Sequence, residues 1–181
     1  MKGGIILLVL MFLGMASCKD DNMPTEPDGI YFGIGSAYLS GNLWEGDTRT
    51  KMAFQSNTHM LLNIDHFSNT VLQGVLTFKY VPLNTGQYEL KKSELNKKDT
   101  VAVAYDTRIG DDDVAGNYYV LLASDTIQDW IKIAGFNNET FEFNGEFQAS
   151  FYRDTTLPKF DQSLPDTLVF TNGKFNGKIT Q

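Results

Sequence analysis

The sequence predicts an all-β domain, with an antiparallel β-sandwich as the first expectation and a closed β-barrel as the alternative. From residue 30 onward, apolar and polar residues alternate with a period of two over most of the chain. Gly, Asn and Asp interrupt this alternation at short intervals, as turns do. No segment shows an apolar stripe of helical period over three turns. Many short strands joined by turns pack as a sandwich or a barrel.

The predicted strands begin with a hairpin, in which Ser40-Gly41-Asn42 separates two short apolar runs. Further strands are expected at 59–67, 71–81, 101–105, 118–123, 130–136, 140–152 and 167–175. In the segment 140–152, every second position is aromatic or small, which predicts one buried face. The segment 90–98 is the one candidate for a short helix. Trp44 and Trp130 are expected to fill the core, because aromatic side chains contribute strongly to core burial.

The first 17 residues have the three parts of an export signal. Lys2 supplies the positive start, residues 5–13 are apolar, and small residues precede Cys18. The apolar run is too short for a transmembrane helix, which needs about 20 residues. Met15-Ala16-Ser17-Cys18 resembles the lipobox of bacterial lipoproteins, in which the cysteine is acylated and becomes the first mature residue. This resemblance implies a lipid anchor on Cys18. The alternative is an ordinary signal peptide that leaves Cys18 as a free thiol.

Residues 18–28 are expected to tether this anchor to a single domain formed by residues 29–181. The segment after the cysteine is acidic, contains two prolines and lacks apolar periodicity, so it cannot form packed structure. Its start, Lys19-Asp20-Asp21, resembles the acidic surface-export signal that follows the cysteine in lipoproteins of the Bacteroidota. The resemblance implies residence in the outer membrane, with the domain exposed at the cell surface.

The charge of the chain argues against nucleic acid as a partner. The formal net charge is −7, and it becomes more negative when the signal with Lys2 is removed. Binding to phosphates requires clustered Lys and Arg, and the one basic cluster, at residues 91–98, is short and expected to be solvated. The expected partners are therefore the membrane, through the anchor, and a glycan or another envelope protein.

No motif predicts catalysis, a cofactor or a metal site, so the domain is not expected to be an enzyme. His59 and His66 are seven residues apart and would lie on opposite faces of one strand, so they cannot share a metal ion there. Asp111-Asp112-Asp113 matches the start of a calcium-binding loop, but the bidentate Glu that should follow is missing. A solvated hairpin loop is the favoured interpretation, with calcium binding left open.

The dipeptide Asp-Thr occurs six times. In four cases the third residue is aliphatic or Thr, which resembles the O-glycosylation acceptor signal of exported Bacteroidota proteins. The resemblance implies glycosylation at Thr100, Thr126, Thr155 and Thr167. The other interpretation is that Asp-Thr suits junctions between turns and strands. Both interpretations remain open.

Four short motifs resemble a family of cell-envelope lipoprotein domains from the Bacteroidota. They are Leu43-Trp44-Glu45 after a hairpin, the Gly-x-Tyr-x-Leu segment 86–90, the Gly-x-Phe segment 145–147, and Thr-Asn-Gly-x-Phe at 171–175. The resemblance implies a β-sandwich lipoprotein without an assigned activity. Together with the anchor, it predicts a non-catalytic binding or adhesion module. The alternative is a structural or accessory subunit of an envelope complex.

Overall fold

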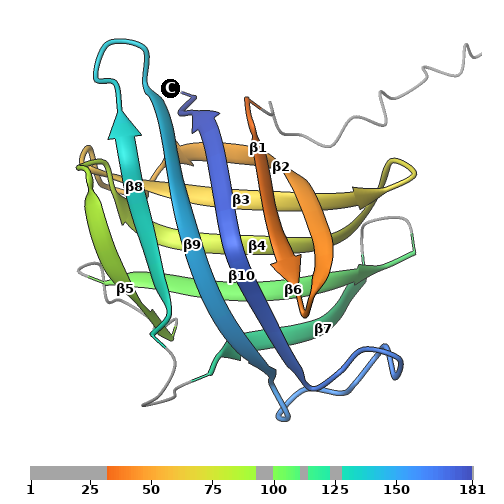
Figure 1. Ribbon diagram of the computed structural model, residues 1–181. Coiled ribbons are helices and arrows are strands. Elements are labelled where there is room, and N and C mark those ends of the chain that lie inside the picture. Colours follow the sequence, from red (N-terminus) through yellow and green to blue (C-terminus); the bar gives the residue numbers. More distant parts are fainter. Residues whose placement is uncertain (1–31, 93–99, 111–113, 123–127, 181) are drawn as a thin grey trace, which may run out of the picture.

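The computed structural model describes residues 32–92, 100–110, 114–122 and 128–180 (Figure 1). Within these ranges the secondary-structure elements are all β-strands. This confirms the all-β prediction. The ten strands are β1 (Ile34–Leu39), β2 (Asn42–Met52), β3 (His59–Ser68), β4 (Val71–Pro82), β5 (Gly86–Lys92), β6 (Val101–Ile109), β7 (Val114–Leu121), β8 (Trp130–Phe136), β9 (Glu142–Arg153) and β10 (Thr167–Lys178).

The sheet closes on itself. Its strand order runs β10-β1-β2-β3-β4-β6-β5-β8-β9, and β9 pairs again with β10. The fold is therefore a nine-stranded β-barrel, and the predicted sandwich is wrong. In Figure 1, β8, β9 and β10 cross steeply in front of β3, β4 and β6. Both folds bury one face of each strand and therefore share the same alternation of apolar and polar residues.

Strand β7 completes the wall beside the ring. It pairs with β6 on one side and with the last residues of β9 on the other. Elsewhere along β6 and β9, strands β5 and β8 lie between these two strands, and β5 runs parallel to β6. Because β5 includes Leu90–Lys92, the helix predicted at 90–98 is wrong for these residues, and 93–99 lie outside the described residues. Leu90 is buried while Glu89 and Lys91 are exposed, which is the period of a strand.

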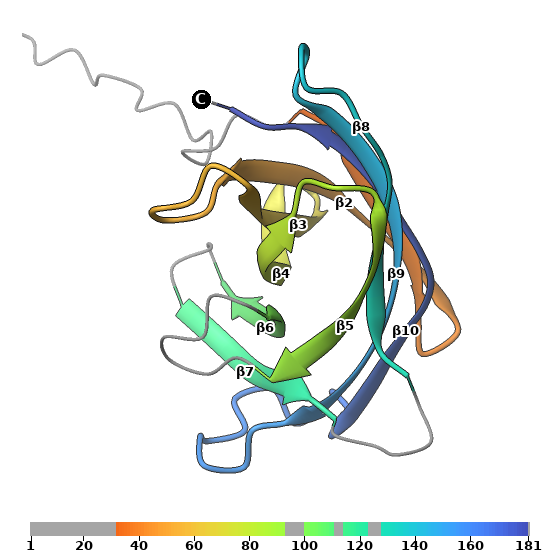
Figure 2. The ribbon, with the colours of Figure 1, turned by 90° about the vertical axis from the view of Figure 1, so that its left-hand side faces the viewer.

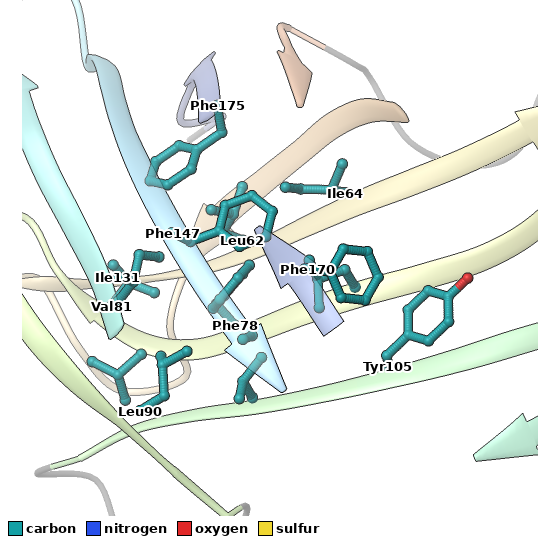
Figure 3. Close-up of a cluster of buried hydrophobic side chains, with 14 of the residues drawn as sticks. Leu62, Ile64, Phe78, Val81, Leu90, Tyr105, Ile131, Phe147, Phe170 and Phe175 are labelled. Atoms are coloured by element: carbon teal, nitrogen blue, oxygen red, sulfur yellow. The ribbon is translucent and has the colours of Figure 1, made fainter. Parts of the chain in front are cut away.

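Large side chains fill the interior of the barrel (Figure 3). The predicted apolar row of β9 is confirmed, because Phe143, Gly145, Phe147, Ala149 and Phe151 are all buried. Phe147 meets Phe78 edge-on with their ring centroids 5.3 Å apart. Trp44 is buried as predicted and meets Phe170 at 5.0 Å. Such pairs add stability beyond the area that they bury.

Trp130 does not fill the core, contrary to expectation. It is half-buried and pairs with Gln148, whose side chain faces outward between the buried Phe147 and Ala149. Its neighbour Ile131 has the inward position instead. Because successive side chains of a strand alternate between its faces, one of these two neighbours has to lie on the outer wall.

The two ends of the barrel differ. β1 begins and β10 ends at one end, here called the terminal end, so the chain preceding Phe32 joins the domain there (Figure 1). The opposite end, here called the loop end, carries the β1–β2 turn and the loop of residues 154–166 between β9 and β10 (Figure 2). No helix among the described residues is long and apolar enough to span a bilayer.

Candidate functional site

An open groove of about 660 Å³ lies on the outer wall at the terminal end, over β8, β9 and β10. Its floor is one cross-strand row, in which Gly135 pairs with Asn144 and Asn144 pairs with Asn176. The neighbours of both asparagines along the strands are buried inward, so the asparagine side chains point out of the barrel. Gly135 has no side chain that could fill the end of this row.

The two floor amides are available for hydrogen bonding. Asn176 Oδ1 accepts a hydrogen bond from the backbone N–H of Ile34 at 3.2 Å, which fixes the side chain and leaves its NH₂ group as a donor on the outer wall. The side chain of Asn144 is exposed and makes no hydrogen bond within the described part of the chain. Each amide offers both donor and acceptor capacity, so the row can bind a ligand that presents both.

An aromatic ring and two opposite charges border this floor. Phe32 is 44% exposed and lines the groove next to β1. Glu142 and Lys178 are exposed partners across β9 and β10 in the row nearest the terminal end. Asn137 also lines the groove, but its Oδ1 accepts hydrogen bonds from the backbone of Glu139 and Thr140 and so holds the β8–β9 turn.

This groove was not predicted from the sequence, in which two of its residues stand in Asn-Gly dipeptides. Asn144-Gly145 and Asn176-Gly177 are Asn-Gly dipeptides, which are typical of tight hairpins. In the structure each lies within a strand, with Asn outward and Gly inward. A Cβ atom on Gly177 would lie 2.7 Å from the ring of Phe143, so glycine is required where the wall meets core aromatics. The recurrence of outward Asn on two long strands was the available signal.

A second polar group lies on the outer faces of β2, β3 and β6. Asp65 is fully buried although it has outward parity, and it accepts hydrogen bonds from Arg49 Nε at 3.0 Å and Nη2 at 2.9 Å. Asp106 pairs with Arg108 at 2.9 Å. Burial raises the pKa of Asp106, the Arg108 guanidinium opposes this change, and the charge of Asp65 adds to it. Because both carboxylates are paired with arginine, this group stabilises the wall.

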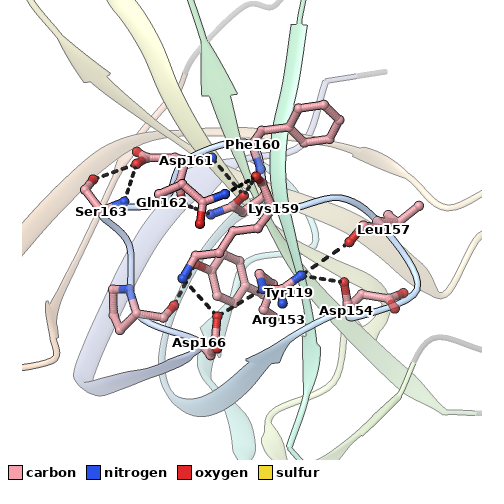
Figure 4. A network of polar contacts seen from close by, with 12 residues as sticks. Tyr119, Arg153, Asp154, Leu157, Lys159, Phe160, Asp161, Gln162, Ser163 and Asp166 are labelled. Carbon is pink, nitrogen blue, oxygen red and sulfur yellow. Dashed lines mark hydrogen bonds and ion pairs between the residues drawn. The ribbon is translucent and has the colours of Figure 1, made fainter.

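The loop of residues 154–166 is fastened to the loop end by a polar network (Figure 4). Tyr119 donates a hydrogen bond to the carbonyl of Pro165 at 2.9 Å. Asp166 accepts from Arg153 Nε at 3.0 Å and from Lys159 Nζ at 3.1 Å. Arg153 also donates to the carbonyl of Leu157. These contacts hold a long loop in one conformation without forming a cleft with catalytic groups.

The predicted modification sites are dispersed. Thr155 and Thr167 are exposed at the two ends of the loop, and Thr100 is half-buried before β6. The aspartates that precede two of them have structural roles, because Asp154 accepts hydrogen bonds from Thr156 and Asp166 pairs with Arg153. Such contacts are typical of a junction between turn and strand. None of the three described threonines lines the groove.

Several predicted sites lie outside the described residues. They are the anchor Cys18, the export signal Lys19, Asp20 and Asp21, the acceptor Thr126, and the acidic segment 111–113. Across the described ranges, no three His, Cys, Asp or Glu side chains gather as a metal site. His66 instead approaches the carbonyl of Glu45 through Nδ1 at 2.6 Å and packs against Trp44.

No protein-family model, curated protein or solved structure matches this chain. Its function is therefore inferred from the chemistry of the groove.

Proposed function

We propose that this protein is a non-catalytic carbohydrate-binding module, carried on a lipid anchor in the outer membrane. The observation that supports it best is the outward row of Asn144 and Asn176 beside the exposed ring of Phe32. Sugar hydroxyls both donate and accept hydrogen bonds, as side-chain amides do. The C–H face of a pyranose ring is apolar and can pack on an aromatic ring. A shallow, open groove can take a few sugar units within a longer chain.

The polar groups of the groove fit binding better than bond cleavage. Glu142 is the one carboxylate among the described residues that line it, and its partner across the strands is Lys178. Glycoside hydrolysis usually uses two carboxylates that flank the bond, and acyl transfer uses a nucleophile beside a base. The lining residues offer neither arrangement. Glu142 and Lys178 are instead suited to hydrogen-bond the hydroxyl or acetamido groups of a bound sugar.

The sequence supports the anchored location. Acylation of Cys18 would attach the chain to a bilayer, and several acyl chains make such attachment effectively permanent. Residues 19–31 span at most about 45 Å when fully extended. The tether enters the domain at the terminal end, so the groove would lie near the membrane and the loop end farther from it. Such a module would hold a glycan close to the cell surface.

The test is oligosaccharide binding by the full chain in detergent micelles, measured by calorimetry and on a printed panel of neutral and N-acetylated oligosaccharides. We expect Asn144→Ala to weaken binding about tenfold or more, because it removes a bidentate group from the centre of the floor. Asn138→Ala is the matched control, since Asn138 is an exposed amide in the adjacent turn and does not line the groove. Equal affinities of the two variants, or no binding on the panel, would contradict the proposal.

The second candidate is an accessory subunit of an envelope complex. It is favoured by the exposed apolar side chains Ile34, Tyr38 and Leu43 on the outer wall. Apolar residues grouped on a water-facing wall are typical of interaction sites. Co-purification of one envelope protein in fixed stoichiometry, lost when Tyr38 is changed to Ser, would favour this candidate over the glycan-binding module.

A further inference from the structure

An apolar stripe runs along the outer face of β1. Ile34 is 62% exposed, Tyr38 is 47% exposed, and Leu43, which pairs with Tyr38 from β2, is 64% exposed. Ser36 lies between Ile34 and Tyr38 on the same face. The outer wall of a barrel in water is normally polar at such positions. The core does not need these side chains, because Gly35, Ala37 and Trp44 take the inward positions of the same strands.

The two sides of this stripe carry residues of opposite charge or opposite hydrogen-bonding character. Ser36 pairs with Lys174 on the β10 side and with Glu45 on the β2 side, and both charged residues are exposed. One row nearer the terminal end, Ile34 pairs with Asp47 on the β2 side, and its backbone N–H donates to Asn176 Oδ1 on the β10 side. One flank therefore offers N–H donors, and the other offers carboxylates.

We propose that this face binds a second copy of the same chain, related by a two-fold axis that runs along β1. In an isologous contact the same patch serves both copies, so it has to complement itself after rotation by half a turn. About an axis along β1, Ile34, Ser36 and Tyr38 meet their own counterparts. The rotation exchanges the two flanks, so Lys174 meets the partner copy's Glu45, and the reverse pair forms on the other side of the axis.

The next row has the same complementarity. The NH₂ group of Asn176, whose Oδ1 is already engaged by Ile34, faces the partner copy's Asp47 after the rotation. The stripe is thus apolar on the axis and joined by polar pairs on both sides, as protein interfaces usually are. An axis across β1 would instead place Lys174 against the partner copy's Lys174, and such like-charge contacts are unfavourable. The charge pattern therefore selects the parallel arrangement.

The parallel arrangement also suits an anchored protein. An axis along β1 puts the terminal ends of both copies on the same side, so two lipid anchors could enter one bilayer (Figure 1). This step rests on the proposed anchor. The barrel wall is convex, so the contact is narrow and weak in solution. Confinement to a membrane raises the effective concentration and makes a weak contact sufficient. The wall curves away from the axis toward Asn144 and Gly135, so this part of each groove stays open, while Phe32 and Asn176 border the contact.

Disulfide cross-linking of the full chain in liposomes tests the axis directly. Ser36→Cys places a thiol on the two-fold axis, and we expect it to form covalent dimers at least about fivefold faster than Thr77→Cys. Thr77 is the matched control, because it is a half-buried hydroxyl residue with outward parity on β4. Equal rates for the two variants, or no dimer from Ser36→Cys, would overturn the proposal.

The unsubstituted chain separates this proposal from the anchor. An acylated Cys18 has no free thiol, so the unsubstituted chain should remain monomeric on a non-reducing gel. If it forms disulfide dimers, the anchor is wrong. The dimer proposal is then decided with soluble protein at high concentration in a Cys18→Ser background, where concentration replaces confinement and only the introduced cysteine can react.

A charge exchange tests the polar pairs. In the Ser36→Cys chain, Lys174→Glu alone and Glu45→Lys alone each create like-charge contacts and should slow cross-linking about fivefold or more. The double variant restores opposite charges across the axis and should recover the rate to within about twofold. A double variant slower than both single variants would overturn the proposed axis. Neither residue lines the groove, so oligosaccharide binding reports whether each variant is folded.

Discussion

Asn117 and Asp161 are bonded to each other in both directions, although they are far apart in the sequence. Asn117 Nδ2 donates to the carbonyl of Asp161 at 2.8 Å, and Asn117 Oδ1 accepts from the backbone N–H of Asp161 at 3.1 Å and of Phe160 at 2.8 Å. Asn117 is fully buried on β7. One side chain thus replaces the strand partner that residues 160 and 161 lack, and it fastens the loop to the barrel.

We expect Asn117→Ala to lower the free energy of unfolding by about 2–4 kcal/mol, because three loop groups lose their partner at a buried site. Urea unfolding followed by fluorescence measures the change. Asn138→Ala, at an exposed turn, should stay within about 0.5 kcal/mol of the unsubstituted chain. Similar midpoints for both variants would show that the loop does not depend on this side chain.

The burial of Asp129 should make its contribution to the stability of the folded protein fall as the pH rises. It is 6% exposed and its Oδ1 has no hydrogen-bond partner. Burial raises the pKa of Asp129 to about 6, and the neighbouring Ser150 offsets only part of this. The folded state therefore binds a proton more tightly than the unfolded state, in which the pKa is about 3.9. The stability from this group is complete below about pH 4 and is lost as the pH passes 6.

Asp129→Asn should remove this dependence. The variant lacks the buried charge at every pH. The difference in unfolding free energy between the variant and the unsubstituted chain should therefore change in favour of the variant by about 2–3 kcal/mol between pH 4 and pH 7. Urea midpoints of both chains at several pH values measure the difference, in which the other titrating groups cancel. A constant difference across this range would mean that Asp129 titrates normally.

Position 145 on β9 should not tolerate any residue larger than glycine. A Cβ atom there would overlap the backbone carbonyl of Lys132 and the ring of Phe175, neither of which can move freely. We expect Gly145→Ala to cost about 3 kcal/mol of unfolding free energy through overpacking. Gly135→Ala is the control on β8, because its Cβ atom would be 3.4 Å from Asn144 Oδ1, the nearest atom. Equal urea midpoints would contradict the close packing of β8, β9 and β10.

Cys18→Ser should release the protein from the membrane fraction or stall its processing, since only an acylated cysteine can retain it there. Fractionation of cells with an antibody against the domain measures this. The unsubstituted chain should partition into detergent, and the variant into the aqueous phase. Unchanged membrane partition and unchanged gel mobility of the variant would end the lipoprotein interpretation.

Replacing Lys19, Asp20 and Asp21 together with Ala should hide the domain from protease added to intact cells. We expect this because the export of the lipoprotein to the cell surface would depend on the charges beside the acylated cysteine. The amount in the membrane fraction should stay the same, which serves as the control. Equal protease sensitivity before and after the replacement would leave this segment as a plain spacer.

Most of the strands could be predicted from the sequence, although the end of β5 was expected to be helical. The hairpin at Ser40 and Gly41, the strand 130–136 and the buried row of β9 follow from alternation and turn residues, because a strand's period is a local property. The same alternation cannot say which strands pair at the edges, since a sandwich and a barrel bury their strands in the same way. The pairing of β9 with β10 and of β1 with both β10 and β2 decided between them.

Only the tertiary structure could locate the groove and the stripe. Asn144 and Asn176 are 32 positions apart, and they become neighbours because β9 and β10 pair in one particular register. Lys174 and Glu45 likewise flank Ser36 only because β1 lies between β10 and β2. A register shift of one residue would turn each of these side chains to the other face of the wall. Local sequence determines which residues can face outward together, and long-range pairing determines which of them meet.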